Sequence, residues 1–370
     1  MEKNIYIVRP EKNIMKKLLL LVLPLFGFGQ MPAYYNGIDF NQTGDALKVQ
    51  LTSLITSTHT TELYYTSSQL DTWDALKQTD LDPTNSSNVF LLYGYDAIPN
   101  DAGDTVLKDD RVRDESLSCH QSGCNGLWVR EHVFPKSLAN PTLDTGDPGA
   151  GTDAHSLRAC DSQMNGSRGN KPFGDGSGNS SILPTTGYWY PGDEWRGDVA
   201  RMMMYMYVRY PSQCKAIDVG TGSTSYSNFG DMPNIFLEWN EEDPVSQYEI
   251  NRNNILEGIQ GNRNPFIDNP YLATMIWNGP SAQDNWNILA TDYIEELSAI
   301  KLYPTVTSDV VFINNASQTP YNYSIVNSLG QQLKTGEALH SIELSEFEKG
   351  FYFINLQLNN AQKTFKIILK

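Results

Sequence analysis

The chain has 370 residues, and a content of 40% hydrophobic and 11% aromatic residues excludes a disordered protein. This length exceeds what one hydrophobic core usually supports, so more than one domain is expected. The 27 basic and 43 acidic residues give a net charge of −16. Such a charge argues against a protein that holds nucleic acid mainly through its overall charge.

The N-terminal residues have the pattern of an export signal. Lys16 and Lys17 precede an apolar run over residues 18–26, which is too short to span a bilayer. We therefore interpret residues 1–30 as upstream sequence and a signal peptide. The mature chain is expected to be secreted or held at the cell surface, with no integral membrane segment.

Two elements are predicted next along the chain. Apolar residues recur at helical spacing up to Ile55, and Thr43 is placed to cap that helix. The continuous apolar run 89–93 predicts a central strand of the core. His59 and His340 belong to no motif and are expected to be exposed to solvent.

The cysteines suit an exported protein with up to two disulfides. Three pairings are possible, and we predict Cys119 with Cys124 and Cys160 with Cys214. Cys119, His120 and Cys124 could instead bind zinc, a less favoured reading because a fourth ligand is missing.

Two polar segments follow. Residues 130–137 read Arg-Glu-His-Val-Phe-Pro-Lys-Ser, and a second segment covers residues 153–173. Adjacent Glu131 and His132 before a proline predict the end of a strand. Residues 161–168 predict a short helix that opens with a polar first turn.

These segments contain the groups that phosphodiester hydrolysis requires. That reaction needs a base for water, a hard cation at the phosphate and positive charge around it. His132 is the candidate base, and Glu131 and Asn165 are candidate metal ligands. The candidate sources of positive charge are Arg130, Arg158 and Arg168.

The two segments resemble the secreted bacterial endonuclease I family of ββα-metal nucleases, over roughly residues 34–280. Val129 and Phe134 depart from the family's usual polar residue and tryptophan, which we interpret as packing or substrate-contact variation. Further segments that match at compatible spacing are 197–203, 208–210, 241–244, 251–253 and 260–266.

The resemblance implies an α+β fold, a mixed helical and strand nuclease core with a ββα-metal motif. It implies a metal-dependent endonuclease that cleaves DNA, with RNA as a further candidate, at little sequence preference and with 5′-phosphate products. Glu131 and Asn165 would bind Mg²⁺, or alternatively Mn²⁺ or Ca²⁺, His132 would act as general base, and Arg168 or Arg158 would neutralise the phosphate.

Other polar residues near the motif have open assignments. Asp153 and His155 are candidate second-shell partners, and His155 is an alternative metal ligand, although a structural role is favoured for both. Arg130 is a candidate substrate contact. The resemblance places Asn262 and Arg263 beside the active site, in a loop that either contacts phosphate or closes turns.

Two helical stretches are predicted beyond the motif. Residues 199–210 are apolar nearly all round, which is typical of a buried helix, and Asp198 is placed to cap it. Residues 237–259 form the second predicted stretch.

From Lys301 onward the chain contains short strands separated by glycine turns, which predicts a small all-β antiparallel sandwich. The region resembles the C-terminal sorting domain of type IX secretion cargo, so the secretion machinery is an expected partner. An ordinary carbohydrate- or protein-binding appendage is the alternative. The predicted strands are 310–313, 321–325, 342–344, 351–354 and 365–369.

The sequence thus predicts a nuclease domain over residues 31–300 and a sorting domain over 301–370, in a monomer. Two other functions stay open. One is a phosphodiesterase acting on another phosphate diester, and the other is a non-enzymatic surface binding module.

Overall fold

The computed structural model describes residues 31–96, 107–121, 123–288, 300–314, 320–358 and 361–370. The predicted signal peptide lies outside these ranges. No helix within them is both long enough and apolar enough to cross a membrane.

Helix α1 (Gly44–Thr58) begins directly after Thr43, as predicted. The Thr43 side chain makes no capping hydrogen bond, so only the position of the cap is confirmed. The apolar stripe of α1 is buried against α4 (Arg196–Arg209) and α8 (Tyr271–Trp277).

Helix α4 is the centre of the helical part. Every residue from Gly197 to Val208 is buried, which confirms the prediction of a helix that is apolar nearly all round. The helix begins at Arg196, so its N-cap is Trp195, and Asp198 lies within the first turn, where its carboxylate accepts a hydrogen bond from Arg158 at 2.9 Å.

The stretch predicted over 237–259 is two helices, α5 (Asn234–Glu242) and α6 (Gln247–Gln260). Pro244 lies between them, and a proline disfavours helical backbone at the residue before it. Ser246 then starts α6 with a capping box, in which its side chain and that of Glu249 each accept a backbone N–H of the other residue.

Two small antiparallel sheets lie beneath the helices. Strands β1 (Leu81–Asp82), β2 (Asn85–Phe90) and β3 (Val112–Asp114) pair in that order, so β2 is central as predicted but ends at Phe90. Strand β4 (Trp128–His132) pairs with β5 (Leu157–Asp161), and the short helix α3 (Ser162–Arg168) follows β5.

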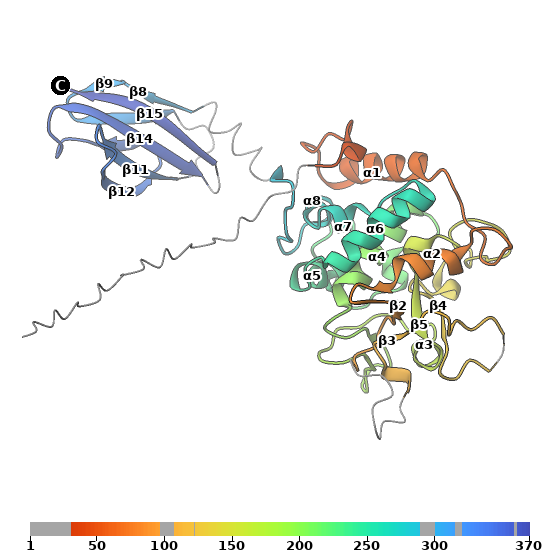
Figure 1. The fold of residues 1–370 in the computed structure, drawn as a ribbon. Coiled ribbons are helices and arrows are strands. Elements are labelled where there is room, and N and C mark those ends of the chain that lie inside the picture. The colour runs from red at the N-terminus through yellow and green to blue at the C-terminus, as the bar shows by residue number, and fades with distance from the viewer. Residues whose placement is uncertain (1–30, 97–106, 122, 289–299, 315–319, 359–360) are drawn as a thin grey trace, which may run out of the picture.

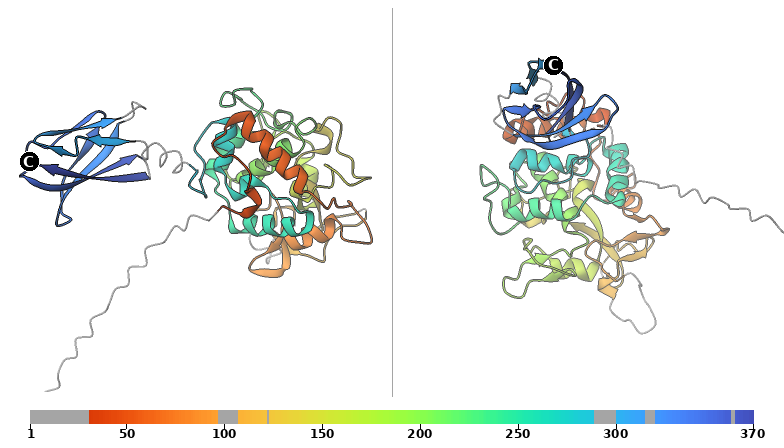
Figure 2. Two further views of the ribbon diagram at one scale, coloured as in Figure 1. Left: turned by 90° about the horizontal axis from the view of Figure 1, so that it is seen from above. Right: turned by 90° about the vertical axis from the view of Figure 1, so that its left-hand side faces the viewer.

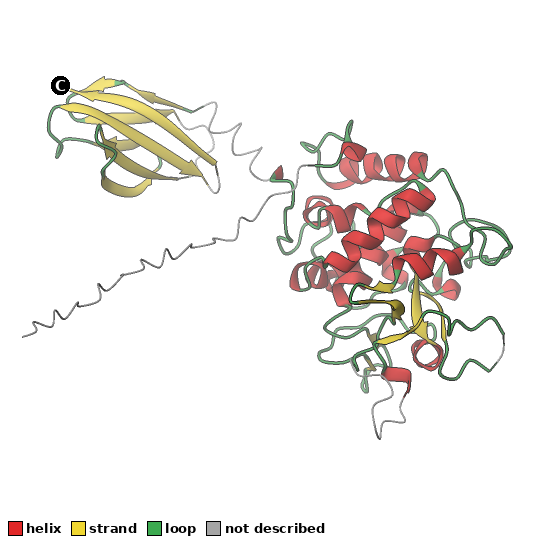
Figure 3. Ribbon diagram, viewed as in Figure 1, coloured by secondary structure: helices red, strands yellow, loops and turns green. Residues whose placement is uncertain are grey.

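Within residues 31–288, helices α1, α4, α6 and α8 gather on one side, with β2 to β5 and α3 on the other (Figures 1 and 3). The right-hand view of Figure 2 shows the same separation. Three further elements complete this region: α2 (Thr72–Thr79), α7 (Pro265–Asp268) and the hairpin of β6 (Ser181–Ile182) with β7 (Trp189–Tyr190).

The C-terminal region is the predicted β-sandwich, with a buried core cluster of its own. One sheet has the order β13-β10-β8, and its strands are β8 (Lys301–Tyr303), β10 (Val310–Asn314) and β13 (Ser341–Glu343).

The second sheet has the order β12-β11-β14-β15-β9, in which β9 and β15 are parallel and the other pairs antiparallel. Strand β12 was not predicted, because its exposed polar residues give no hydrophobic signal. The strands are β9 (Val306–Thr307), β11 (Tyr321–Asn327), β12 (Gln332–Ala338), β14 (Gly350–Leu358) and β15 (Ala361–Leu369).

A buried ion pair joins α4 to α6. Arg201 on α4 donates from Nε and Nη2 to the two carboxylate oxygens of Glu249 on α6, at 2.6 and 2.9 Å. Both side chains are buried, so the geometry must offset the cost of removing two charges from water.

We expect Glu249→Ala to destabilise the region of residues 31–288 by about 3–5 kcal/mol, because it leaves the Arg201 charge buried without its closest carboxylate. Tryptophan fluorescence during urea unfolding measures this region alone, since no tryptophan occurs after Lys301. Glu241→Ala, at an exposed position of α5, should change the unfolding free energy by less than about 0.5 kcal/mol. Equal effects of the two variants would contradict the prediction.

Candidate active site

The site is built on the pairing of β4 with β5. In this register Glu131 lies opposite Arg158 and His132 opposite Leu157. Asp161 ends β5 and caps α3 by accepting from the backbone N–H groups of Gln163 and Met164, at 2.7 and 2.9 Å. The strand end at His132 and the short helix are therefore both as predicted.

Glu131 presents a buried carboxylate. Its Oε1 accepts a hydrogen bond from Tyr93 at 3.3 Å and lies 3.6 Å from Nε of Arg168. Burial raises the pKa of Glu131 to about 7, although Arg168 and Tyr93 act in the opposite direction. Within the described ranges, the second carboxylate oxygen has no hydrogen-bond or ion-pair partner.

Tyr93 is a site residue that belongs to neither of the two polar sequence segments. It has a φ of 72°, an uncommon value for a bulky residue. The chain leaves β2 here, and this backbone turn carries the Tyr93 hydroxyl to Glu131. The only signal in the sequence was its place at the end of the apolar run 89–93.

Arg168 is fully buried. Its Nη2 donates to the carbonyl of Val133 at 2.8 Å and its Nη1 to the carbonyl of Gly169 at 3.0 Å. The guanidinium therefore orients Glu131 and ties α3 to the end of β4. Arg168 was expected to neutralise the phosphate. Its guanidinium is instead enclosed and does not face an open site where a phosphate could bind.

His132 is held in one tautomer. Its Nε2 lies 2.8 Å from the carbonyl oxygen of Gly151, and because a carbonyl can only accept, Nε2 carries the proton. Nδ1 then keeps a free lone pair. Burial first, and then the charges of Lys136, Arg130 and Arg168, lower the pKa of His132 to about 4, so the ring is neutral near pH 7.

Position 151 has room only for glycine. A Cβ there would lie 1.8 Å from the carbonyl oxygen of Asp144, so no other residue fits without moving the backbone. The loop between β4 and β5 thereby brings its carbonyl to His132.

Asn165 lies on α3 and is half-buried, and its amide has no hydrogen-bond partner within the described ranges. Among all the residues that the structure describes, no three His, Cys, Asp or Glu side chains lie close enough together to form a metal site. A cation bound to both Glu131 and Asn165 would have one carboxylate, one amide oxygen and water as its ligands. That set fits Mg²⁺, which prefers oxygen ligands and retains several waters.

Asp153 and His155 belong to the core. Asp153 accepts from Tyr205 at 2.7 Å and from Gln260 at 3.0 Å, while Nε2 of His155 lies 3.2 Å from the carbonyl of Asn262. His59 is buried with its Nδ1 3.9 Å from Asp153, so the expectation that it is exposed was wrong. These contacts favour structural roles and do not bring His155 to Glu131.

Three further candidate site residues form hydrogen bonds inside the protein. Arg158 is buried and donates to Asp198 at 2.9 Å, so the expected phosphate contact is not seen. Asn262 donates to Tyr205 at 2.7 Å, and Arg263 to Asp268 at 2.7 Å. The loop that contains Asn262 and Arg263 therefore closes turns rather than offering its side chains to substrate.

The cysteines are partly as predicted. Cys119 and Cys124 form a disulfide, so the zinc alternative does not hold. Cys160 and Cys214 are buried free thiols, which corrects the second predicted pair. Cys160 instead places its Sγ 3.3 Å from the carbonyl of Leu92.

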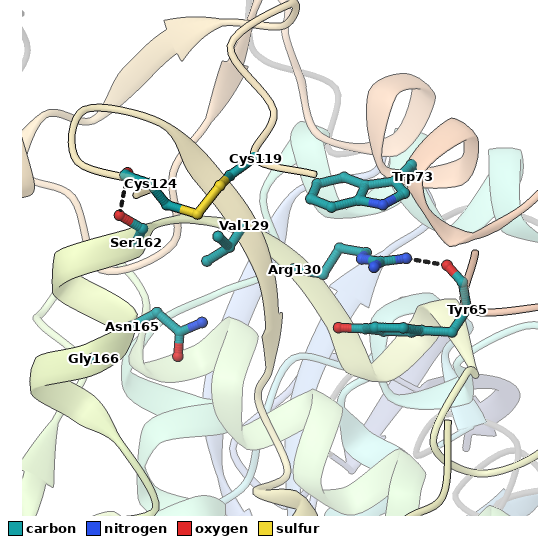
Figure 4. A pocket seen from close by; sticks show the side chains of 9 residues that line it. All are labelled: Tyr65, Trp73, Cys119, Cys124, Val129, Arg130, Ser162, Asn165 and Gly166. Atoms are coloured by element: carbon teal, nitrogen blue, oxygen red, sulfur yellow. Dashed lines mark hydrogen bonds between the residues drawn. A yellow bond between two sulfur atoms is a disulfide. The ribbon is translucent and has the colours of Figure 1, made fainter. Parts of the chain in front are cut away.

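Arg130 is stacked between two rings, with its guanidinium carbon 3.4 Å from the ring centre of Tyr65 and 4.0 Å from that of Trp73 (Figure 4). The Tyr65 ring also stacks on His132, with centroids 5.5 Å apart. Tyr65 lies outside both sequence motifs, and no local pattern could have identified it.

The chain matches known proteins in both parts. The sequence profile described as Endonuclease I matches residues 43–271, and that of a secretion system C-terminal sorting domain matches residues 301–370. A protein of Bacillus subtilis strain 168 named extracellular ribonuclease is 39% identical over 273 residues, which cover 70% of this chain and 83% of that protein. A Bacillus amyloliquefaciens protein of the same name is 40% identical over 247 residues, 64% of this chain and 75% of that protein.

The Asp153 contacts predict a dependence of stability on pH. Burial alone would raise its pKa, but the nearby His59 and His155 and the hydrogen bonds from Gln260 and Tyr205 lower it to about 2, from an ordinary 3.8. Asp153 therefore stabilises the fold above pH 4, and this contribution is lost as the pH falls from about 4 to about 2.

We expect the unfolding free energy of wild type to exceed that of Asp153→Asn by about 2 kcal/mol near pH 6, with the difference vanishing near pH 2. Urea titrations followed by tryptophan fluorescence across this range measure it. Asp147→Asn, at an exposed loop position, should follow wild type throughout. A difference that does not change with pH would show that the Asp153 charge is not involved.

Proposed function

The chain belongs to the Endonuclease I family, and from this we propose that it is a secreted endonuclease that hydrolyses phosphodiester bonds of both RNA and DNA with a divalent cation. Little sequence preference and 5′-phosphate ends are part of the proposal. The observation that carries it is His132 at the end of β4, next along the chain to Glu131, whose Nε2–H is bound by the Gly151 carbonyl so that Nδ1 keeps its lone pair.

In this mechanism His132 removes a proton from the attacking water through Nδ1. The Gly151 carbonyl fixes the ring and favours the positive charge that the proton brings. Glu131 and Asn165 would hold Mg²⁺, with Mn²⁺ or Ca²⁺ as alternatives. When bound, the cation supplies Lewis-acid stabilisation of charge on the phosphate and the leaving oxygen.

Two arginines and two tyrosines position these groups. Arg168 and Tyr93 orient the Glu131 carboxylate, and Tyr65 stacks on the His132 ring. Arg130 in turn stacks on Tyr65. Lys136, just beyond β4, lowers the pKa of His132 by its charge and is a candidate contact for phosphate.

Activity on both RNA and DNA follows from the choice of nucleophile. A water molecule activated by His132 attacks phosphorus without help from a 2′-hydroxyl, so the reaction does not depend on ribose. The names of the two Bacillus relatives add RNA to the DNA that the family resemblance suggests.

The C-terminal sorting domain marks the chain for delivery to the cell surface or beyond it. We assign it the type IX secretion machinery as partner and no part in catalysis. A monomer suffices for the proposed reaction, because every group named above comes from one chain.

A substrate panel tests the proposal directly. Plasmid DNA and ribosomal RNA should both be cleaved with Mg²⁺ present, and prior treatment with a chelator should abolish both reactions. The DNA fragments should be ligatable without kinase treatment, which reports 5′-phosphates. Cleavage of RNA alone with cyclic phosphate ends would instead indicate attack by the 2′-hydroxyl.

His132→Ala and Asn165→Ala should fail for different reasons. His132→Ala should lower kcat about 10²–10⁴-fold, the usual contribution of a general base, while Mn²⁺ affinity measured by calorimetry stays near wild type. Asn165→Ala should weaken Mn²⁺ binding and recover part of its activity at high Mn²⁺.

His340→Ala, at an exposed position of the sorting domain, is the matched control and should keep full activity. Full activity of His132→Ala would remove the proposed base.

A further inference from the structure

A pocket of about 540 Å³ is lined in part by Asn165, one of the two proposed metal ligands (Figure 4). Asn165 and Gly166 of α3 line one side, and Arg130 with its stacked rings lines the other. The wall is completed by Tyr65, Trp73, Val129, Ser162 and the Cys119–Cys124 disulfide. Its volume lies within the range of pockets that enclose a small organic ligand.

The charge of the pocket favours an anion. None of the described lining residues is acidic, although the whole chain carries a net charge of −16. Arg130 makes no ion pair within the described ranges, since its Nη groups donate to the carbonyl of Tyr65 and to the hydroxyls of Thr72 and Thr66. Its positive charge therefore remains uncompensated by a carboxylate contact.

The wall is rigid before any ligand binds. Arg130 is fixed by those hydrogen bonds and by the two rings that sandwich it, so it acts as a charged, preformed surface. Tyr65 is fixed by the same stack and by its contact with His132. This stack links the pocket wall to the proposed base.

The polar atoms of the pocket suit a phosphate better than a base edge. Two polar groups of the pocket are already engaged. The Ser162 hydroxyl donates to the Cys124 carbonyl, and we assign the Asn165 amide oxygen to the cation. The Tyr65 hydroxyl accepts from the Arg130 guanidinium, which leaves its own proton available to donate, and its side chain reaches into the pocket (Figure 4). Val129 and the disulfide add an apolar surface.

We propose that this pocket binds the nucleotide next to the scissile phosphate, with the Tyr65 hydroxyl donating to a phosphate oxygen and Val129 and the disulfide contacting the sugar. The inference rests on the proposed function and adds a subsite to it. Because the described side chains of the pocket offer no available donor or acceptor besides the Tyr65 hydroxyl, which we assign to the phosphate, the subsite accepts any of the bases.

Val129→Phe tests the subsite by filling it. The KM for a 12-nucleotide single strand should rise about tenfold, because the added ring occupies the space of the sugar. Val49→Phe, the same change at an exposed position of α1, is the matched control. The Mn²⁺ affinity of Val129→Phe should match wild type, which shows that the cation site is intact.

Tyr65→Phe removes the hydroxyl but keeps the stacked ring, so it tests the phosphate contact even where Val129→Phe folds poorly. We expect kcat/KM for the same strand to fall about tenfold, through KM. Tyr64→Phe, at the exposed neighbouring tyrosine, is its control.

Kinetics of Tyr65→Phe indistinguishable from Tyr64→Phe would overturn the subsite while leaving the nuclease function in place. If wild type cleaves no nucleic acid, the proposed function itself fails.

Discussion

Strand β4 pairs with β5 in one register, and the position of each proposed catalytic group follows from that pairing. Side chains alternate along a strand, so a slip of one residue would turn Glu131 to the opposite face. The same pairing places Asp161 at the end of β5, where it caps α3 and sets the direction in which Asn165 projects. The loop between the strands returns with the carbonyl of Gly151, which fixes the proton on His132.

Arginine in this protein serves the interior as much as the surface. Arg158, Arg168 and Arg201 are all buried and bonded to carboxylates or carbonyls. Guanidinium groups suit this use because they stay charged and donate in several directions. Few basic groups near the site are therefore left for substrate, and Arg130 contributes its charge while its donors hold the loop of Tyr65. An acidic protein can thus present a locally positive site without a broad basic face.

Several features that depend on neighbouring residues in the sequence were predicted correctly, and several that depend on contacts between distant segments were not. The strand end at His132, the capped helix after Asp161 and the buried helix over 199–210 rest on local patterns, and all were found in the structure. The roles of Tyr65, Tyr93 and Gly151 arise from contacts between distant segments, which no local pattern contains. Arg158 and Arg168 were placed at the phosphate by charge alone, but burial beside Asp198 and Glu131 decides what each guanidinium contacts.

Cys160 and Cys214 stay reduced because the fold encloses them, and that protection ends when the fold is lost. Heating in air would expose both sulfhydryl groups while Cys119 and Cys124 are still joined, so thiolate attack could exchange the native bridge for mispaired ones. Thermal inactivation of the secreted enzyme should then become irreversible with time at alkaline pH. Acidic buffer, which keeps the thiols protonated, would preserve the ability to refold.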